Sequence, residues 1–245
     1  MKVIASCIAC MKKSAETFQT AGSSIPVRFF PAEIDDAGVV YITCEHGHHT
    51  AMIHRNRKHQ ILFDSGCLAL LDDYTNEAVS SFSAALERAY EFFIRVSYRK
   101  LGVSFSLLES SWKQIAVQSE RQFGAFILLF PVVAGESFSL PQIIPELRNK
   151  IIHRGYIARS GEVVEYAKLV FLVIRKIMQV LNDKCPTEMW AEINEAAELQ
   201  KKSVPQGMEW AWTVTSEFDL ERDLTFETWL TRLKERFEAP RRNVV

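Results

Sequence analysis

Four sulfur and nitrogen side chains near the N-terminus have the spacing of a metal site. Cys7 and Cys10 form a Cys-x2-Cys pair, and Cys44 and His48 follow about one small structural module later. Two thiolates separated by two residues can hold one tetrahedral Zn²⁺ through a tight turn, and a second pair on a hairpin would complete the coordination. The sequence therefore predicts a structural zinc ion bound by Cys7, Cys10, Cys44 and His48.

The sequence does not decide which histidine is the fourth ligand. The second cluster reads Cys-Glu-His-Gly-His-His, so His46 and His49 are alternatives to His48. Its Cys-x-x-Gly-His order resembles the second knuckle of zinc ribbons, in which glycine permits the tight turn. A module this small buries little apolar surface, and metal binding is the usual remedy. The alternative is two unrelated clusters, of buried thiols and of surface histidines. Catalytic zinc is disfavoured, since Glu45 is the only carboxylate close by in sequence.

A second dense stretch runs from residue 140 to residue 155 and contains an arginine, an asparagine and a histidine. Pro145 suits the first turn of a helix and Gly155 suits its left-handed exit. On an ideal helix Asn149 and His153 share a face, whereas Arg148 and His153 diverge by about 140°. We therefore expect that a long side chain, a helix end or a second subunit brings Arg148 and His153 together.

Within this stretch, Arg148-Asn149-x3-His153 resembles the R-x4-6-H motif of HEPN domains, which are helical bundles. The resemblance covers roughly residues 61–183. It implies a homodimer in which motifs from both subunits line a cleft, and in many members a metal-independent endoribonuclease. Small proteins of this type are usually toxins or antiviral defence effectors of prokaryotes or phages.

The residue types suit that chemistry. His153 would act as general acid or base on the 2′-hydroxyl or the leaving oxygen of RNA, because histidine titrates near neutrality. Arg148 would stabilise the charge that builds on the phosphorane. Asn149 would orient His153 or the phosphate, and Glu87 would anchor Arg148 from a neighbouring helix. The expected products are a 2′,3′-cyclic phosphate and a 5′-hydroxyl end.

Two exposed cations of the same stretch, Lys150 and Arg154, are expected to bind the RNA phosphates. The competing hypothesis is a non-catalytic adaptor, because HEPN-like bundles also serve as dimerisation or binding modules and a histidine at a helix end often only caps carbonyls. A DNA-binding regulator is disfavoured, since the chain has neither a clear recognition helix nor a basic charge, its formal net charge being -1.

The elements that would position these groups are mostly helical. Residues 76–101 and 162–181 place apolar side chains at alternating spacings of three and four. This pattern predicts two long amphipathic helices, each with one buried face. The sequence therefore predicts a mainly α fold, a helical bundle preceded by a small β module. Further helices are expected at 61–73, 106–118, 120–133, 187–202 and 225–238, and strands at 26–30, 39–43 and 50–54.

Three regions follow from these patterns: a zinc-ribbon-like module at 1–60, a helical bundle at 61–185, and a Trp-rich helical extension at 186–245. The first and the last are the expected contact regions for a protein partner. With 48% hydrophobic and 24% charged residues, the 245-residue chain is an ordinary folded protein. No apolar run is long enough to cross a bilayer and no signal peptide is recognisable, so we expect a cytoplasmic protein without a membrane partner.

Overall fold

The chain folds into two compact units, which are described one at a time. The computed structural model describes residues 2–21, 29–55, 57–213 and 223–242. Unit 1 comprises Met1–Arg57, Ile193–Thr215 and Thr231–Val245, and unit 2 comprises Lys58–Glu192 and Ser216–Leu230. Helices predominate over strands, and a small sheet region lies at the N-terminus. The predicted class, a helical bundle preceded by a small β module, is confirmed.

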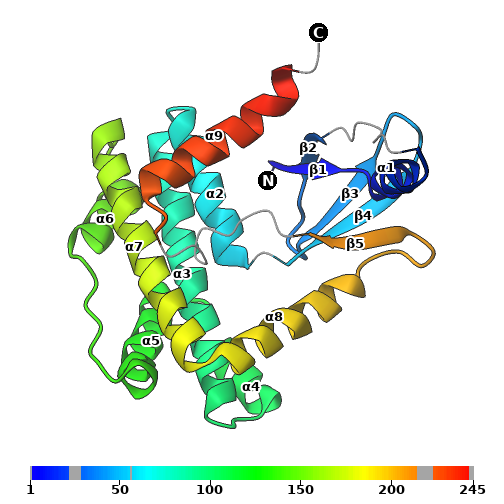
Figure 1. Cartoon of the computed structure of the whole chain (residues 1–245). Coiled ribbons are helices and arrows are strands. Elements are labelled where there is room, and N and C mark those ends of the chain that lie inside the picture. The colour runs from blue at the N-terminus through cyan, green and yellow to red at the C-terminus, as the bar shows by residue number, and fades with distance from the viewer. Residues whose placement is uncertain (1, 22–28, 56, 214–222, 243–245) are drawn as a thin grey trace. The chain divides into compact units, whose positions relative to one another are not determined.

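Two small sheets form the centre of unit 1 (Figure 1). In the first, β1 (Lys2–Ser6) pairs antiparallel with β2 (Phe29–Glu33). In the second, β3 (Val39–Thr43) and β4 (His49–His54) form an antiparallel hairpin, and β5 (Glu209–Thr213) adds to β4 in parallel orientation. The parallel pairing joins segments about 160 positions apart, so unit 1 is completed by a strand from near the end of the chain.

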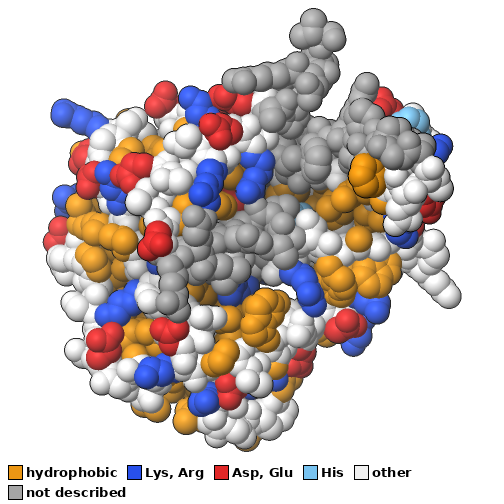
Figure 2. Space-filling model, viewed as in Figure 1, with side chains coloured by type: hydrophobic (Ala, Val, Ile, Leu, Met, Phe, Trp, Pro, Cys, Tyr) orange, Lys and Arg blue, Asp and Glu red, His pale blue; other side chains and the backbone are white. Residues whose placement is uncertain are grey.

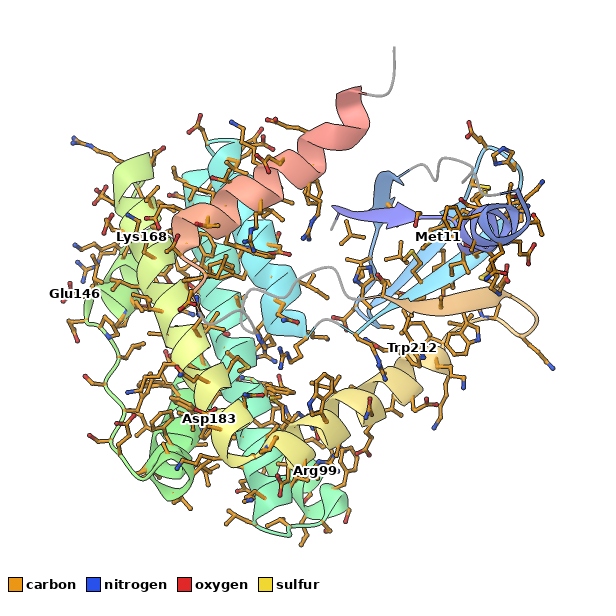
Figure 3. All side chains as sticks on the ribbon, viewed as in Figure 1. Met11, Arg99, Glu146, Lys168, Asp183 and Trp212 are labelled. Atoms are coloured by element: carbon orange, nitrogen blue, oxygen red, sulfur yellow. The ribbon has the colours of Figure 1, made fainter. Side chains whose placement is uncertain are left out.

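The two faces of the three-stranded sheet have different neighbours within unit 1. On one face, α1 (Ile8–Ala21) contacts β4 and β5, and Lys12 pairs with Glu209. Side chains alternate between the faces of a strand, so Trp210 and Trp212 point to the opposite face. There Lys201, at the end of α8 (Pro186–Lys201), lies 5.0 Å from the centre of the Trp210 ring. Figure 3 labels Met11 on α1 and Trp212 on β5.

The strand predictions of unit 1 were partly correct. The strand predicted at 39–43 coincides with β3, and the one predicted at 50–54 lies within β4. Of the strand predicted at 26–30, Phe29 and Phe30 belong to β2, and positions 26–28 lie outside the described residues. The elements β1, α1 and β5 were not predicted. The strands β1 and β5 are only five residues long, and α1 was missed because Cys7 and Cys10 were interpreted as a metal-binding turn.

Unit 2 is organised around the long helix α3 (Thr75–Lys100), which contacts five other helices. The helix α4 (Phe105–Ile115) packs more lightly, with only Leu108 and Trp112 buried among its residues. The predicted apolar stripes of the two longest helices are buried, so the helical periodicity is confirmed. Besides α4, the partners of α3 are α2 (Lys58–Leu71), α5 (Ser119–Ala134), α6 (Ile143–Arg154) and α7 (Ser160–Lys184).

Aromatic rings fill the core of unit 2. Phe126 on α5 is fully buried and packs edge-to-face on Phe93 at 5.1 Å and on Phe138 at 4.8 Å between ring centres. It also stacks on Tyr90 at 4.5 Å. Such contacts add to the burial of large apolar surfaces. This core needs no metal, because it is built from apolar side chains of several helices.

The residues predicted as a separate C-terminal extension are divided between the two units. The strand β5 belongs to unit 1, whereas Phe226 and Trp229, at the start of α9 (Phe226–Arg242), belong to unit 2. Trp229 is buried, and its indole N–H donates a 3.1 Å hydrogen bond to Asp64 on α2. The Trp-rich segment therefore contributes to two cores, since β4 needs a neighbouring strand and α2 leaves apolar surface to cover.

Charged side chains are mixed on the visible surface. Figure 2 shows Lys and Arg interspersed with Asp and Glu over unit 2, with apolar side chains between them. Among the described residues, the search for a helix with the length and apolar character of a membrane span found none.

Candidate metal centre and the Arg148–His153 segment

The four predicted metal ligands come from two turns of unit 1. Cys7 lies between β1 and α1, and Cys10 lies in the first turn of α1. Cys44 and His48 lie at the two ends of the tight turn that joins β3 to β4. In this turn the Gly47 N–H donates to Cys44 O at 2.9 Å, and Gly47 has φ of 75°, which favours glycine. The tight turn predicted for Cys44 to His48 is therefore present. Cys7 and Cys10, by contrast, lie at the start of a helix rather than in a second turn of this kind.

The donor atoms of these four residues lie within 4.8 Å of one another and could hold a metal ion. The Nδ1 atom of His48 is 3.4 Å from Cys10 Sγ, 3.5 Å from Cys44 Sγ and 3.7 Å from Cys7 Sγ. The Sγ atoms of Cys10 and Cys44 are 3.8 Å apart. Ligands of tetrahedral Zn²⁺ lie about 3.8 Å apart for two sulfurs and about 3.5 Å for sulfur and nitrogen, given the usual bond lengths. The donor set and its spacing fit zinc.

The other two histidines of the cluster have different contacts. His49 Nδ1 lies 3.0 Å from Thr43 Oγ1, so this ring is engaged on the exposed side of the hairpin. His46 Nδ1 lies 3.5 Å from Cys10 Sγ but is not part of the four-residue group. His46 is placed to hydrogen-bond a ligand sulfur, a contact that orients ligands in metal sites. The geometry thus favours His48 among the three candidates for the fourth position.

The thiols influence one another strongly. Burial, together with the hydrogen bonds and charges of the adjacent Cys7 and Cys44, raises the pKa of Cys10 to about 12. Burial also opposes ionisation of Cys44, but the backbone N–H groups of His48 and His46 outweigh it and lower the pKa of Cys44 to about 6. Three sulfurs this close repel one another when ionised, and a divalent cation would remove the repulsion. By contrast, Cys67 and Cys185 are buried, and burial raises the pKa of each.

The Arg148–His153 segment lies on α6 of unit 2. Gly155 ends this helix with φ of 64°, as the sequence predicts, and the Tyr156 N–H donates to Lys150 O at 3.2 Å. This hydrogen-bond pattern satisfies the last carbonyl groups of a helix. His153 is therefore held in the last turn of α6, where its side chain is exposed to solvent. The neighbouring Asn149, Lys150 and Arg154 are exposed as well.

Arg148 is half-buried between α6 and α3. Its Nη2 atom is 3.8 Å from Glu87 Oε1, and its Nη1 donates to Asn149 Oδ1 at 3.2 Å. Glu87 is the partner that the sequence analysis assigned to Arg148. Burial raises the pKa of Glu87, and the positive charge of Arg148 opposes that shift. The guanidinium is thus held by a carboxylate on the central helix, with an amide beside it.

Glu120, in the first turn of α5, is close enough to both cations for their charges to act on it. Its pKa is lowered first by the hydrogen bond from its own backbone N–H and also by the charges of Arg148 and His153. Arg148 and His153 lie five positions apart on α6, and both act on this carboxylate through their charge. Sequence spacing gave no sign of Glu120, because it lies 28 positions before Arg148 and only the packing of α5 brings it near.

A buried hydroxyl pair lies next to the same arginine. Tyr166 on α7 is fully buried, and its hydroxyl oxygen is 2.7 Å from Ser83 Oγ. Ser83 donates to Val79 O at 2.7 Å, so Tyr166 must be the donor to Ser83. Burial raises the pKa of Tyr166 to about 12, while the charge of Arg148 opposes the shift. The phenol therefore stays neutral and gives Arg148 a polar neighbour inside the unit.

Comparisons with known proteins found no matching family model, no matching curated protein and no matching solved structure.

Proposed function

We propose that this chain is a metal-independent endoribonuclease of the HEPN type that acts as a homodimer. One observation carries the proposal: Arg148 is anchored by Glu87 at 3.8 Å, and His153 is exposed on the same helix, with Glu120 near both charges. A fixed guanidinium and an accessible imidazole on one helix are groups that metal-independent phosphodiester cleavage can use. In a cell such an activity would serve as a toxin or an antiviral defence effector in the cytoplasm.

In the proposed reaction the RNA 2′-oxygen attacks the adjacent phosphorus, and the bond from phosphorus to the 5′-oxygen breaks. His153 of one copy takes the 2′-hydroxyl proton, and the same histidine of the second copy gives a proton to the leaving 5′-oxygen. Arg148 stabilises the charge on the non-bridging oxygens. Asn149 orients the guanidinium to which it is hydrogen-bonded, and the exposed Lys150 and Arg154 bind flanking phosphates.

For unit 1 we propose a structural Zn²⁺ bound by Cys7, Cys10, Cys44 and His48. The mixed thiolate and imidazole donor set and the donor spacing support zinc over the harder cations, which prefer oxygen ligands. Four protein ligands leave no open position for a substrate, so the ion would have a structural role. With this module, unit 1 would target a protein or nucleic-acid partner to the nuclease.

The decisive experiment is cleavage of total and transfer RNA in EDTA by the purified protein, with analysis of the 3′ ends. We expect 2′,3′-cyclic phosphate ends, and a loss of rate of about 100-fold or more in His153→Ala with an unchanged melting temperature. His49→Ala is the matched control, because His49 is also exposed and lies in unit 1. A wild-type protein that binds RNA or a protein partner without cutting RNA would instead support the non-catalytic adaptor.

A further inference from the structure

The connection between α6 and α7 is fastened by one asparagine of α3. Asn76 Nδ2 donates to Tyr156 O at 3.0 Å, and Asn76 Oδ1 accepts from the Ala158 N–H at 3.2 Å. Both ends of a single amide thus hold the backbone that follows His153. Two backbone groups just beyond the helix end, where regular hydrogen bonding has stopped, are satisfied by this one side chain.

The surrounding contacts make the same connection rigid. The Tyr156 hydroxyl donates to Glu162 at 2.9 Å, and Glu162 also accepts from the Arg159 N–H at 3.0 Å. These contacts tie the connection to the first turn of α7, whereas Asn76 ties it to the first turn of α3. The end of α6 that carries His153 is therefore attached to two long helices.

Asn76 and Glu87 lie on the same helix and hold α6 at two separate points. Eleven positions of α3 separate them, a rise of about 16 Å. Glu87 holds α6 near its middle through Arg148, and Asn76 holds the segment directly after it. The buried side chains of α6, Ile144, Leu147 and Ile151, also hold the helix, and the Asn76 contact adds a restraint directly after the end that carries His153.

We propose that Asn76 is a positioning residue that fixes His153 relative to Arg148 by clamping Tyr156 and Ala158 onto α3. The inference rests on the proposed function, since it names a residue that would support the same site. Asn76 does not reach the reacting atoms. It acts through the backbone after α6, so its loss should disturb the placement of the imidazole, which the chemical step requires within a narrow range. The phosphate contacts of Arg154 and Lys150 should be affected less, because long exposed side chains can adjust to a small shift of the helix end.

The test compares wild type with Asn76→Ala and with Asn182→Ala, a control at an exposed position of α7. We expect the Ala158 amide to exchange with solvent at least about tenfold faster in Asn76→Ala, because its acceptor is gone. We expect kcat to fall about tenfold or more, with KM within about twofold of wild type. Faster exchange with unchanged kcat would overturn the proposal, as would an Ala158 amide that remains protected.

Two arms keep the test decisive. If Asn76→Ala does not fold, Asn76→Asp replaces it: this variant keeps the acceptor for Ala158 and loses the donor to Tyr156 O, so Ala158 should stay protected while kcat still falls. If the wild-type protein cleaves no RNA, the proposed function fails. NMR relaxation of the His153 ring then tests whether Asn76 holds the end of α6 in place. A ring that becomes more mobile in the variant supports it, and equal mobility refutes it.

Discussion

The two units of this protein are held together in different ways. In unit 2, Phe126, Phe93 and their neighbours form an aromatic core within one bundle of long helices. In unit 1, the strands are short, β5 comes from near the other end of the chain, and four potential metal ligands gather at one end of the β3–β4 hairpin. Unit 1 also buries apolar side chains such as Val39, Val40 and Ile53, but its strands are short, so we expect a bound metal to contribute more to its stability than to that of unit 2.

Removal of the proposed metal should have the largest effect, and it tests whether unit 1 depends on a bound ion while unit 2 does not. With the proposed zinc extracted by a strong chelator, or in Cys44→Ser, we expect the amides of β3 and β4 to lose protection from hydrogen exchange while those of α3 and α7 keep it. Metal binding contributes about 10 to 16 kcal/mol to the folding of small zinc modules. His49→Ala should retain one metal ion per chain, and a Cys44→Ser protein with intact β4 protection would contradict the idea.

The substitution Phe126→Ala tests the aromatic core of unit 2 and leaves the proposed metal ligands unchanged. This substitution removes a fully buried ring with several aromatic neighbours, so we expect a loss of about 3 to 5 kcal/mol in the free energy of unfolding. Metal content should stay at the wild-type value. Leu128→Ala on the same helix is the control, because Leu128 is 75% exposed and should change stability by less than about 0.5 kcal/mol. Loss of the metal in Phe126→Ala would show that the units are strongly coupled.

A smaller effect tests the contribution of the C-terminal segment to unit 2. Trp229→Phe removes the N–H that donates to Asp64 at 3.1 Å within a buried environment. We expect a loss of about 1 to 3 kcal/mol, measured by denaturant unfolding, because a buried acceptor loses a donor. A double-mutant cycle with Asp64→Ala isolates the contact, because alanine has no acceptor, and a coupling energy near zero would mean that Trp229 packs on α2 through apolar area alone.

The smallest effect concerns pH. Burial raises the pKa of Glu87 in the folded protein, so the folded chain binds this proton more tightly than the unfolded chain. The stability contributed by that proton is present below the unfolded pKa and is lost as pH rises through the folded pKa. Relative to Glu87→Gln, the wild-type melting temperature should therefore rise by about 1 to 2 °C as the pH is lowered from 7 to 4. If the melting temperatures of the two proteins change with pH by the same amount, the prediction that burial raises the pKa of Glu87 is wrong.

Prediction from sequence succeeded where a pattern is local and long. The stripes of α3 and α7 identified two buried helices, and Pro145 and Gly155 marked the limits of α6, because helical periodicity and end signals lie within one element. The knuckle from Cys44 to His48 was also recognisable, since its ligands and glycine lie within a few positions. By contrast, α1 was not predicted, because Cys7 and Cys10 read as a knuckle and the apolar spacing after them is weak.

The sequence alone determined the helical class, the long amphipathic helices and the two pairs of candidate metal-ligand residues, all of which depend on residue type and short spacing. Only the tertiary structure decided that β5 completes the sheet of unit 1, that Glu120 lies near Arg148 and His153, and that Asn76 holds the backbone after α6. These three features join positions far apart along the chain, and long-range contacts depend on how packed surfaces fit together, a property that no local pattern encodes.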